Sequence, residues 1–275
     1  MIYKSFIFPI LGHFASARKI GLKALSFVMS VPFVRWLFRL RYCRKKYEMT
    51  TELFGIQFPG PIALADGFDP SANHFADLGN LGFSYVSIGP FDDSTQGSKD
   101  GYLWTSIRNL QLKTSRKVRV AAVLEGDCVK SFSLLYDFVD FFCVKMSSDD
   151  IQDIAQTVDD LLEMRLCYDS DKPMVIKILP HTDMDMLHAA LDYCRFSGID
   201  AVALPCEYVS SAQEYTGGRL PIIAYGEGMT AEKTAAMLAA GATMVEIDGE
   251  FPLEGPSVVK KYIKYIRQNS PANKS

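Results

Sequence analysis

Apolar and polar positions alternate most regularly in residues 219–249. A short apolar run at residues 220–224 leads into a glycine turn, Gly226-Glu227-Gly228. An alanine-rich stretch follows, which Thr230 can cap at its start and Gly241 can end. A second apolar run at residues 243–247 stops at Gly249. A strand, a glycine loop, a helix and a second strand in about thirty residues predict one βαβ unit with parallel strands.

The same kind of apolar run recurs along the whole chain. Each run is short and flanked by Gly, Pro or polar residues, as expected of strands that helices cover from outside. Helical periodicity lies between most runs, at residues 150–166, 183–196 and 255–267. The eight runs are residues 61–66, 83–89, 118–124, 141–146, 174–180, 201–206, 220–226 and 243–248. A flavodoxin-like sheet needs fewer strands, so the count predicts an α/β fold of the (β/α)8 TIM-barrel type.

Two connections between these runs depart from the barrel pattern. Residues 91–117 are long, polar and poorly periodic, which favours a functional loop over a plain helix. Residues 207–218 are too few for a full barrel helix. In a (β/α)8 barrel the catalytic groups lie at the carboxyl ends of the strands, and the last loops often hold a phosphate.

Charge is divided unevenly along the 275 residues. The net charge is −3, but residues 1–48 carry ten Lys or Arg and one acid, and the rest is near −12. The basic segment is also rich in aromatic and aliphatic residues, and no apolar run is long enough to span a bilayer. We therefore expect residues 1–48 to form a basic amphipathic helical arm on an anionic membrane surface, and residues 49–275 to form the barrel.

Other readings of the arm stay open. It can be a helical cap on the end of the barrel, or a signal peptide cleaved after Ala15-Ser16-Ala17. No nucleic-acid recognition motif accompanies the basic charge, so nucleic acid is not an expected partner. Six scattered cysteines without a CxxC pair read as reduced core thiols, and four histidines without ligand spacing predict no metal site.

The order of parts resembles the class 2 dihydroorotate dehydrogenases. The likeness is clearest in FGIQFPGPIALADGFDPSANHFADLGNLGFSYVSIG, residues 54–89, where a hydrophobic run enters Ala-x-Gly-x-Asp and a later strand ends in Ile-Gly. It returns in MVIKILP (174–180), in GIDAVAL (198–204) and between residues 218 and 256. The resemblance covers most of the chain and is weakest in its middle third.

The resemblance implies an oxidoreductase of pyrimidine biosynthesis. In that family FMN lies at the mouth of the barrel, a serine takes a proton from dihydroorotate, and a hydride goes to the flavin. Electrons then pass to a membrane quinone that enters between the arm helices. The expected location is the cytoplasmic side of the inner membrane, as a peripheral flavoprotein. The flavin supplies the redox chemistry, and the protein supplies position and charge.

Site residues carry over position by position. Ser148 matches the catalytic serine base, and Lys177 matches the family's strand-five lysine near the flavin. Lys145 stands where the family has an asparagine and can replace a lysine lost at Pro70. The cofactor-binding residues implied by the resemblance are Ala65, Gly67, Gly89, Lys145, Lys177, Gly226, Gly228 and Gly249.

Several family positions differ here, so two alternatives stay open. The asparagine-rich substrate segment is not found between residues 89 and 118, and acids occupy two phosphate-loop positions, Glu227 and Asp248. One alternative is a non-catalytic relative that keeps the barrel as a binding or regulatory module. The other is a different chemistry that uses acids at the strand ends, for which the candidates are Asp66, Glu207, Glu227 and Asp248.

Overall fold

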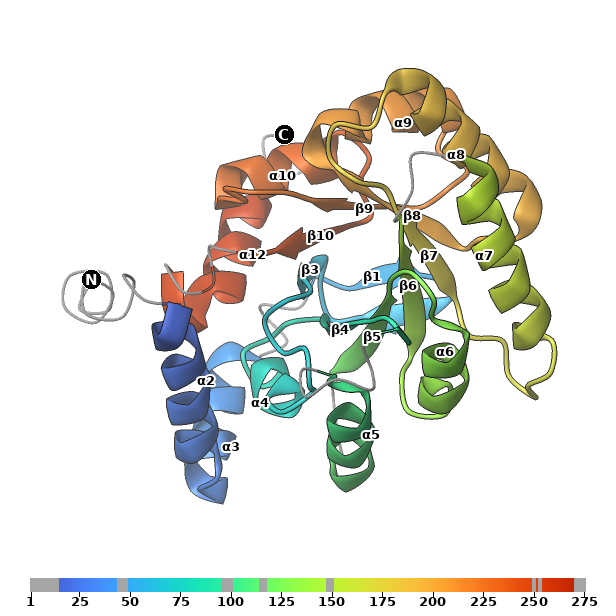
Figure 1. The fold of residues 1–275 in the computed structure, drawn as a ribbon. Coiled ribbons are helices and arrows are strands. Elements are labelled where there is room, and N and C mark those ends of the chain that lie inside the picture. Colours follow the sequence, from blue (N-terminus) through green and yellow to red (C-terminus); the bar gives the residue numbers. More distant parts are fainter. Residues whose placement is uncertain are drawn as a thin grey trace.

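The computed structural model describes residues 15–43, 49–94, 101–113, 118–146, 151–248, 251 and 254–269. Eight parallel strands close into one barrel in the order β3-β4-β5-β6-β7-β8-β9-β10, with β10 pairing back to β3. Helices surround the ring of strands (Figure 1). The predicted (β/α)8 TIM barrel is confirmed.

Every apolar run predicted as a strand overlaps one barrel strand, and only β4 extends beyond its predicted run. The match follows from burial, because each of these strands packs helices on its outer face and side chains on its inner face. The strands are β3 (Ile62–Leu64), β4 (Tyr85–Phe91), β5 (Arg119–Leu124), β6 (Phe141–Lys145), β7 (Met174–Lys177), β8 (Ala201–Pro205), β9 (Ile222–Tyr225) and β10 (Met244–Ile247).

Helices follow most strands and begin where the sequence places caps. The Asp183 side chain accepts a hydrogen bond from Met186 N, and Thr230 accepts one from Lys233 N. The barrel helices are α4 (Phe75–Gly79), α5 (Leu103–Leu112), α6 (Val129–Leu135), α7 (Ile151–Arg165), α8 (Met184–Ser197), α9 (Val209–Thr216), α10 (Ala231–Ala239) and α12 (Val258–Asn269). As predicted, the helix after β8 is short, eight residues preceded by a 3-10 turn (Cys206–Tyr208).

The second connection was expected to be a functional loop, and this is wrong for its central part. Residues 103–112 form the helix α5, which buries Leu103, Ser106, Ile107 and Leu110. The Asn109 side chain ties α5 to the β3–α4 loop by donating to Ser71 O at 2.9 Å. Polar residues hide the helical period in this stretch because only one narrow face of α5 packs against the barrel.

A hairpin that the apolar pattern did not predict closes the amino end of the barrel. It consists of β1 (Thr51–Leu53) and β2 (Ile56–Phe58), paired antiparallel. Leu53 and Phe58 are buried with the inward-facing side chains of the barrel, and Phe58 meets Tyr85 with ring centroids 6.2 Å apart. Three-residue strands are too short to give a clear alternation, which is why the pattern missed them.

Two helices precede the hairpin and lie on one flank of the barrel beside α4, drawn in blue in Figure 1: α2 (Ala15–Met29) and α3 (Pro32–Tyr42). Helix α2 is anchored, because Leu22 and Met29 are buried in the main core. The Ser26 Oγ also lies 2.6 Å from His74 Nδ1 and from Asp77 Oδ2. Helix α3 has no buried residue.

Seven apolar side chains of these two helices and of the turn between them are exposed. They are Phe27, Val28, Val31, Phe33, Trp36, Leu37 and Leu40, and we call them the apolar face of the arm. Among the described residues no single helix is long and apolar enough to cross a membrane. Residues 21–29 and 32–42 meet that test only as a pair, bent by 108°.

Candidate functional site

The carboxyl end of the barrel holds a buried lysine on its inner face. Lys177 ends β7, where alternation turns Val175 and Lys177 inward. Its side chain is only 6% exposed. An ammonium group is this deeply buried only when partners compensate for its lost hydration.

Two carboxylates from other strands provide that compensation. The Lys177 Nζ donates to Asp66 Oδ1 at 2.6 Å and to Glu246 Oε2 at 2.9 Å. Asp66 follows β3, and Glu246 lies in β10. The three residues are far apart in sequence and meet because the closed barrel directs their strand ends toward one axis.

Three further side chains complete the cluster. Tyr85 and Ser87, from β4, donate their hydroxyls to Glu246 Oε1 at 3.0 and 3.2 Å. The Tyr225 ring covers Lys177, with Nζ 4.5 Å from the ring centroid, and its hydroxyl donates to Ile178 O. We call these six residues the lysine cluster: Asp66, Tyr85, Ser87, Lys177, Tyr225 and Glu246.

Charge pairing fixes the ionisation of the cluster. Burial alone lowers the pKa of Lys177, but the charges of Glu246 and Asp66 outweigh it, so the pKa is raised. Burial acts to raise the pKa of Asp66, but the Lys177 charge and its hydrogen bond outweigh that and hold the pKa below its usual value. One lysine lies between two acidic side chains, so the formal charge of the cluster is −1.

Lys145, the other lysine predicted to bind the cofactor, lies next to Lys177 in register across β6 and β7. Its Nζ pairs with Glu125 Oε1 at 2.9 Å, and both side chains are about one-third exposed. Lys145 thus reaches the open end of the barrel, already paired with a carboxylate of its own.

Gly67 and Gly228 leave their backbone open at this end of the barrel. Both have positive φ, +88° and +62°, which favours glycine at these positions. A Cβ added to either would meet nothing within 4 Å. A flat ligand can therefore approach the main chain at Gly67 and Gly228 without displacing a side chain.

Packing gives a second explanation for two other predicted residues. A Cβ on Gly89 would lie 2.7 Å from Val123 O, and a Cβ on Gly226 would lie 3.3 Å from Cys206 Sγ. Glycine is needed at residue 89 by the neighbouring strand, whether or not a ligand binds. Ala65 is buried directly after β3 and donates its backbone N–H to Ile247 O.

Ser148 and Gly249 lie outside the described residues, so their predicted roles stay predictions. Asp248 is described and exposed at the end of β10. Glu227 is also exposed; its carbonyl accepts a hydrogen bond from Lys233 Nζ at 2.8 Å, which brings a cation to the start of α10. The described residues contain no group of His, Cys, Asp or Glu that could hold a metal ion.

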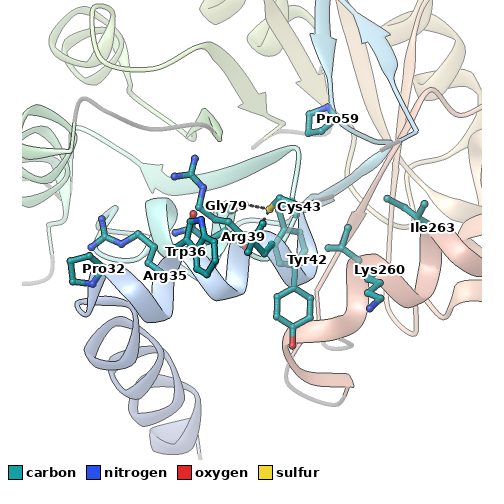
Figure 2. Close-up of a pocket in the computed structure, with 15 residues that line it drawn as sticks. Pro32, Arg35, Trp36, Arg39, Tyr42, Cys43, Pro59, Gly79, Lys260 and Ile263 are labelled. Carbon is teal, nitrogen blue, oxygen red and sulfur yellow. Dashed lines mark hydrogen bonds between the residues drawn. The ribbon is translucent and has the colours of Figure 1, made fainter. Parts of the chain in front are cut away.

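A separate cavity of about 690 Å³ lies between α3 and the barrel (Figure 2). Pro59, Gly82 and Phe83 line its barrel side; Pro59 lies between β2 and β3, and the other two lie just before the amino end of β4. Its described lining includes three cations, Arg35, Arg39 and Lys260, and no acid. This cavity is therefore at the other end of the barrel from the lysine cluster.

Sequence reasoning did not single out Glu246, Tyr85, Ser87 or Tyr225. A usable sign was present for Glu246, because it is a charged residue within the buried run MVEI at an inward-facing alternate position. Tyr85 and Ser87 share the inward face of β4 by the same alternation. Their pairing was not predictable, since it joins residues 159 and 161 positions apart.

Comparisons with known proteins agree with the barrel fold. No protein-family model matches the chain. It is 22% identical to the dihydroorotate dehydrogenase (quinone) of Christiangramia forsetii over 330 aligned positions, covering 94% of this chain and 97% of that protein. Identity is 23% to the enzyme of the same name from Polynucleobacter asymbioticus, covering 79% and 86%.

The alignment with the Christiangramia protein is longer than this chain, so that relative has segments with no counterpart here. Among solved structures, a ligand-free DHODH from Eimeria tenella superposes with a TM-score of 0.73 at 16% identity, covering 88% of this chain and 94% of that one. Its complex with ferulenol gives 0.72 at 15%, covering 88% and 89%. The chain is a divergent relative of the quinone-linked dihydroorotate dehydrogenases, built on the same barrel fold.

Proposed function

We propose that the protein is an FMN-dependent oxidoreductase of the dihydroorotate dehydrogenase type. The observation that carries the proposal is Lys177, the lysine that the resemblance places near the flavin, buried at the carboxyl end of the barrel. The relatives along nearly the whole chain, named dihydroorotate dehydrogenase (quinone), support it. They favour an oxidoreductase over a non-catalytic binding module.

The residues at the barrel mouth fit a flavin ring. Gly67 and Gly228 offer open backbone to a planar group, and Lys177 offers an ammonium at the same end of the barrel. The remaining cofactor residues of the proposal are Ala65, Gly89, Lys145, Gly226 and Gly249. The N-terminal turn of α10, with Lys233 beside it, is the proposed place for the phosphate.

When bound, FMN supplies the hydride-accepting chemistry. Ser148 is the proposed base and holds the proton that leaves a dihydroorotate-like substrate. A serine hydroxyl accepts a proton only when it is desolvated and hydrogen-bonded, so this role requires a site from which water is excluded. Lys177 would orient the ring through its remaining N–H donor and would be the one positive charge of the cluster beside it. The proposed electron acceptor is a membrane quinone.

The direct test of the cofactor is the visible absorbance of the full chain purified in mild detergent, before and after added FMN and washing. We expect flavin bands near one FMN per chain. Addition of dihydroorotate without oxygen should then bleach them, and a quinone should restore them. A colourless protein that also refuses added FMN would overturn the proposal.

Two glycine substitutions test whether FMN binds at the carboxyl end of the barrel. Gly67→Val places a side chain where the ring would lie, and we expect FMN binding to weaken more than about tenfold, because close approach to the backbone is lost. Gly55→Val is the matched control: Gly55 also has positive φ and open surroundings, but it lies in the hairpin at the opposite end. Equal loss of FMN in both variants would mean that strain alone is responsible.

We also propose that the arm, residues 1–48, binds the surface of an anionic membrane, on the cytoplasmic side. The apolar face of the arm is large, and Lys23, Arg35, Arg39 and Arg41 lie on the same two helices. Apolar side chains enter the interface while cations meet anionic headgroups, each cation adding about 1 kcal/mol.

Vesicle sedimentation tests the arm. The full chain should bind vesicles that contain anionic phospholipid, and binding should fall with added salt. The double change Phe33→Ser and Leu37→Ser should weaken binding about tenfold or more, because it removes apolar area that enters the interface. Phe196→Ser is the control, since Phe196 is 83% exposed, more than Phe33 or Leu37, and lies on α8, away from the arm. Unchanged binding by the double variant would contradict this role for α3.

A further inference from the structure

We infer that Asp66 and Glu246 are positioning residues that cancel the charge of Lys177, so that the barrel mouth presents a negative rather than a positive charge to its cofactor. The inference rests on the proposed function, because it concerns the site where FMN is proposed to bind. We expect these two acids to lower the affinity of the site for reduced FMN relative to oxidised FMN.

The geometry leaves little of the ammonium available. A lysine ammonium has three N–H donors. Two of them are directed to carboxylates, at 2.6 Å to Asp66 and 2.9 Å to Glu246. The Tyr225 ring covers the same ammonium at 4.5 Å. A ring brought to this mouth can therefore take at most one donor from Lys177.

The two acids differ in what they present to a ligand. Glu246 is 4% exposed and its other oxygen accepts from Tyr85 and Ser87, so its charge is enclosed. Asp66 is 21% exposed and is the more open of the two acids. A ligand that enters from the carboxyl end therefore meets the Asp66 carboxylate before it meets Lys177.

The next charges do not reverse this balance. Lys145 lies beside Lys177 in the sheet but pairs with Glu125 at 2.9 Å, which makes that pair neutral. When this pair is added to Lys177, Asp66 and Glu246, the total is two positive and three negative charges. Glu227 and Asp248, exposed at the ends of β9 and β10, add two negative charges, and Lys233 at the start of α10 adds one positive charge.

Two-electron reduction places negative charge on a flavin ring, so a carboxylate beside it disfavours the reduced form and a cation favours it. Removal of one carboxylate charge should therefore raise the affinity for reduced FMN relative to oxidised FMN. We expect a change of about tenfold or more, which corresponds to a rise of about 30 mV in the midpoint potential of a two-electron couple.

The experiment compares the native full chain with Asp66→Asn and Glu246→Gln, each nearly isosteric and each leaving Lys177 one carboxylate partner. Glu214→Gln is the matched control, because it removes the same charge from an exposed position on α9 away from the cluster. Binding of oxidised FMN is measured by titration, and the midpoint potential by reduction against dyes of known potential. Glu246→Gln serves as the second variant if Asp66→Asn does not fold.

Four outcomes separate this inference from the proposed function. A rise of about 30 mV or more in either acid variant, with Glu214→Gln unchanged, supports it. FMN binding with equal potentials in all proteins overturns it and leaves the function standing. FMN bound by an acid variant but refused by the native chain overturns both, because the native site then holds no flavin on which the two acids could act. Refusal of FMN by every protein overturns both.

Discussion

Lys177→Met should lower the free energy of unfolding by about 3–5 kcal/mol near pH 7, the cost of removing one partner from a buried ion pair. The methionine fills similar space, but it leaves the Asp66 and Glu246 carboxylates without their shared cation. Glu246 is almost fully enclosed, so its charge cannot be hydrated in place. Denaturation by urea, followed by circular dichroism, measures the difference.

The pH dependence of this loss has a defined sign. In the native protein the pKa of Asp66 is lowered, so its contribution to stability is present above the unfolded pKa of about 4 and is lost as the pH falls through the folded value. Without Lys177, burial favours the protonated carboxyl. The deficit of the variant should therefore be largest near pH 7 and shrink toward pH 5.

Lys145→Met provides the comparison. It breaks a lysine–carboxylate pair of the same length, 2.9 Å, on the neighbouring strand, but one that is about one-third exposed. Solvent screens such a pair, so the expected loss is about 1 kcal/mol or less. A loss at Lys177 no larger than at Lys145 would show that the lysine cluster is hydrated rather than buried.

Gly89→Ala should be destabilising by a comparable amount, about 2–5 kcal/mol, from two sources. Gly89 has φ +96°, a conformation that costs an alanine about 1–2 kcal/mol. Its Cβ would also lie 2.7 Å from Val123 O, which forces β4 and β5 apart and adds about 1–3 kcal/mol. Thermal and urea unfolding both report the change.

Gly67→Ala separates these two sources. Gly67 has nearly the same φ, +88°, but a Cβ there meets nothing within 4 Å, so only the backbone term of about 1–2 kcal/mol should appear. Equal losses in the two variants would mean that the strand can adjust around residue 89. The comparison also distinguishes a glycine that packing requires, Gly89, from one whose surroundings are open to a ligand, Gly67.

The barrel could be predicted from the sequence because its signature is local. Each strand is an apolar run such as Phe141–Lys145, bounded by polar residues, and the number of runs excludes smaller sheets. The hairpin could not be predicted, since three residues are too few to show a period. Helix α5 was mistaken for a loop because its buried face is narrow and its other positions are polar.

The site was predictable only in part. Alternation along β7 places Lys177 inside, and the family resemblance gave it a role. The ion pairs could not be predicted, because Asp66 and Glu246 are 111 and 69 residues from Lys177 and pattern gives no distances between strands. The buried acid Glu246 was nevertheless visible as a charge within an apolar run, a feature that favours an internal partner.

The β1–β2 hairpin closes the barrel at its amino end. Leu53 and Phe58 fill the amino end, and the Phe54 and Phe141 rings lie 5.4 Å apart just above them. Protons of the Lys177 ammonium are therefore expected to exchange with solvent at the carboxyl end, where Asp66 is partly exposed. The rate of deuterium uptake by the hydroxyl and ammonium groups of the cluster then reports solvent access at the carboxyl end alone. A ligand bound at that end should slow the uptake.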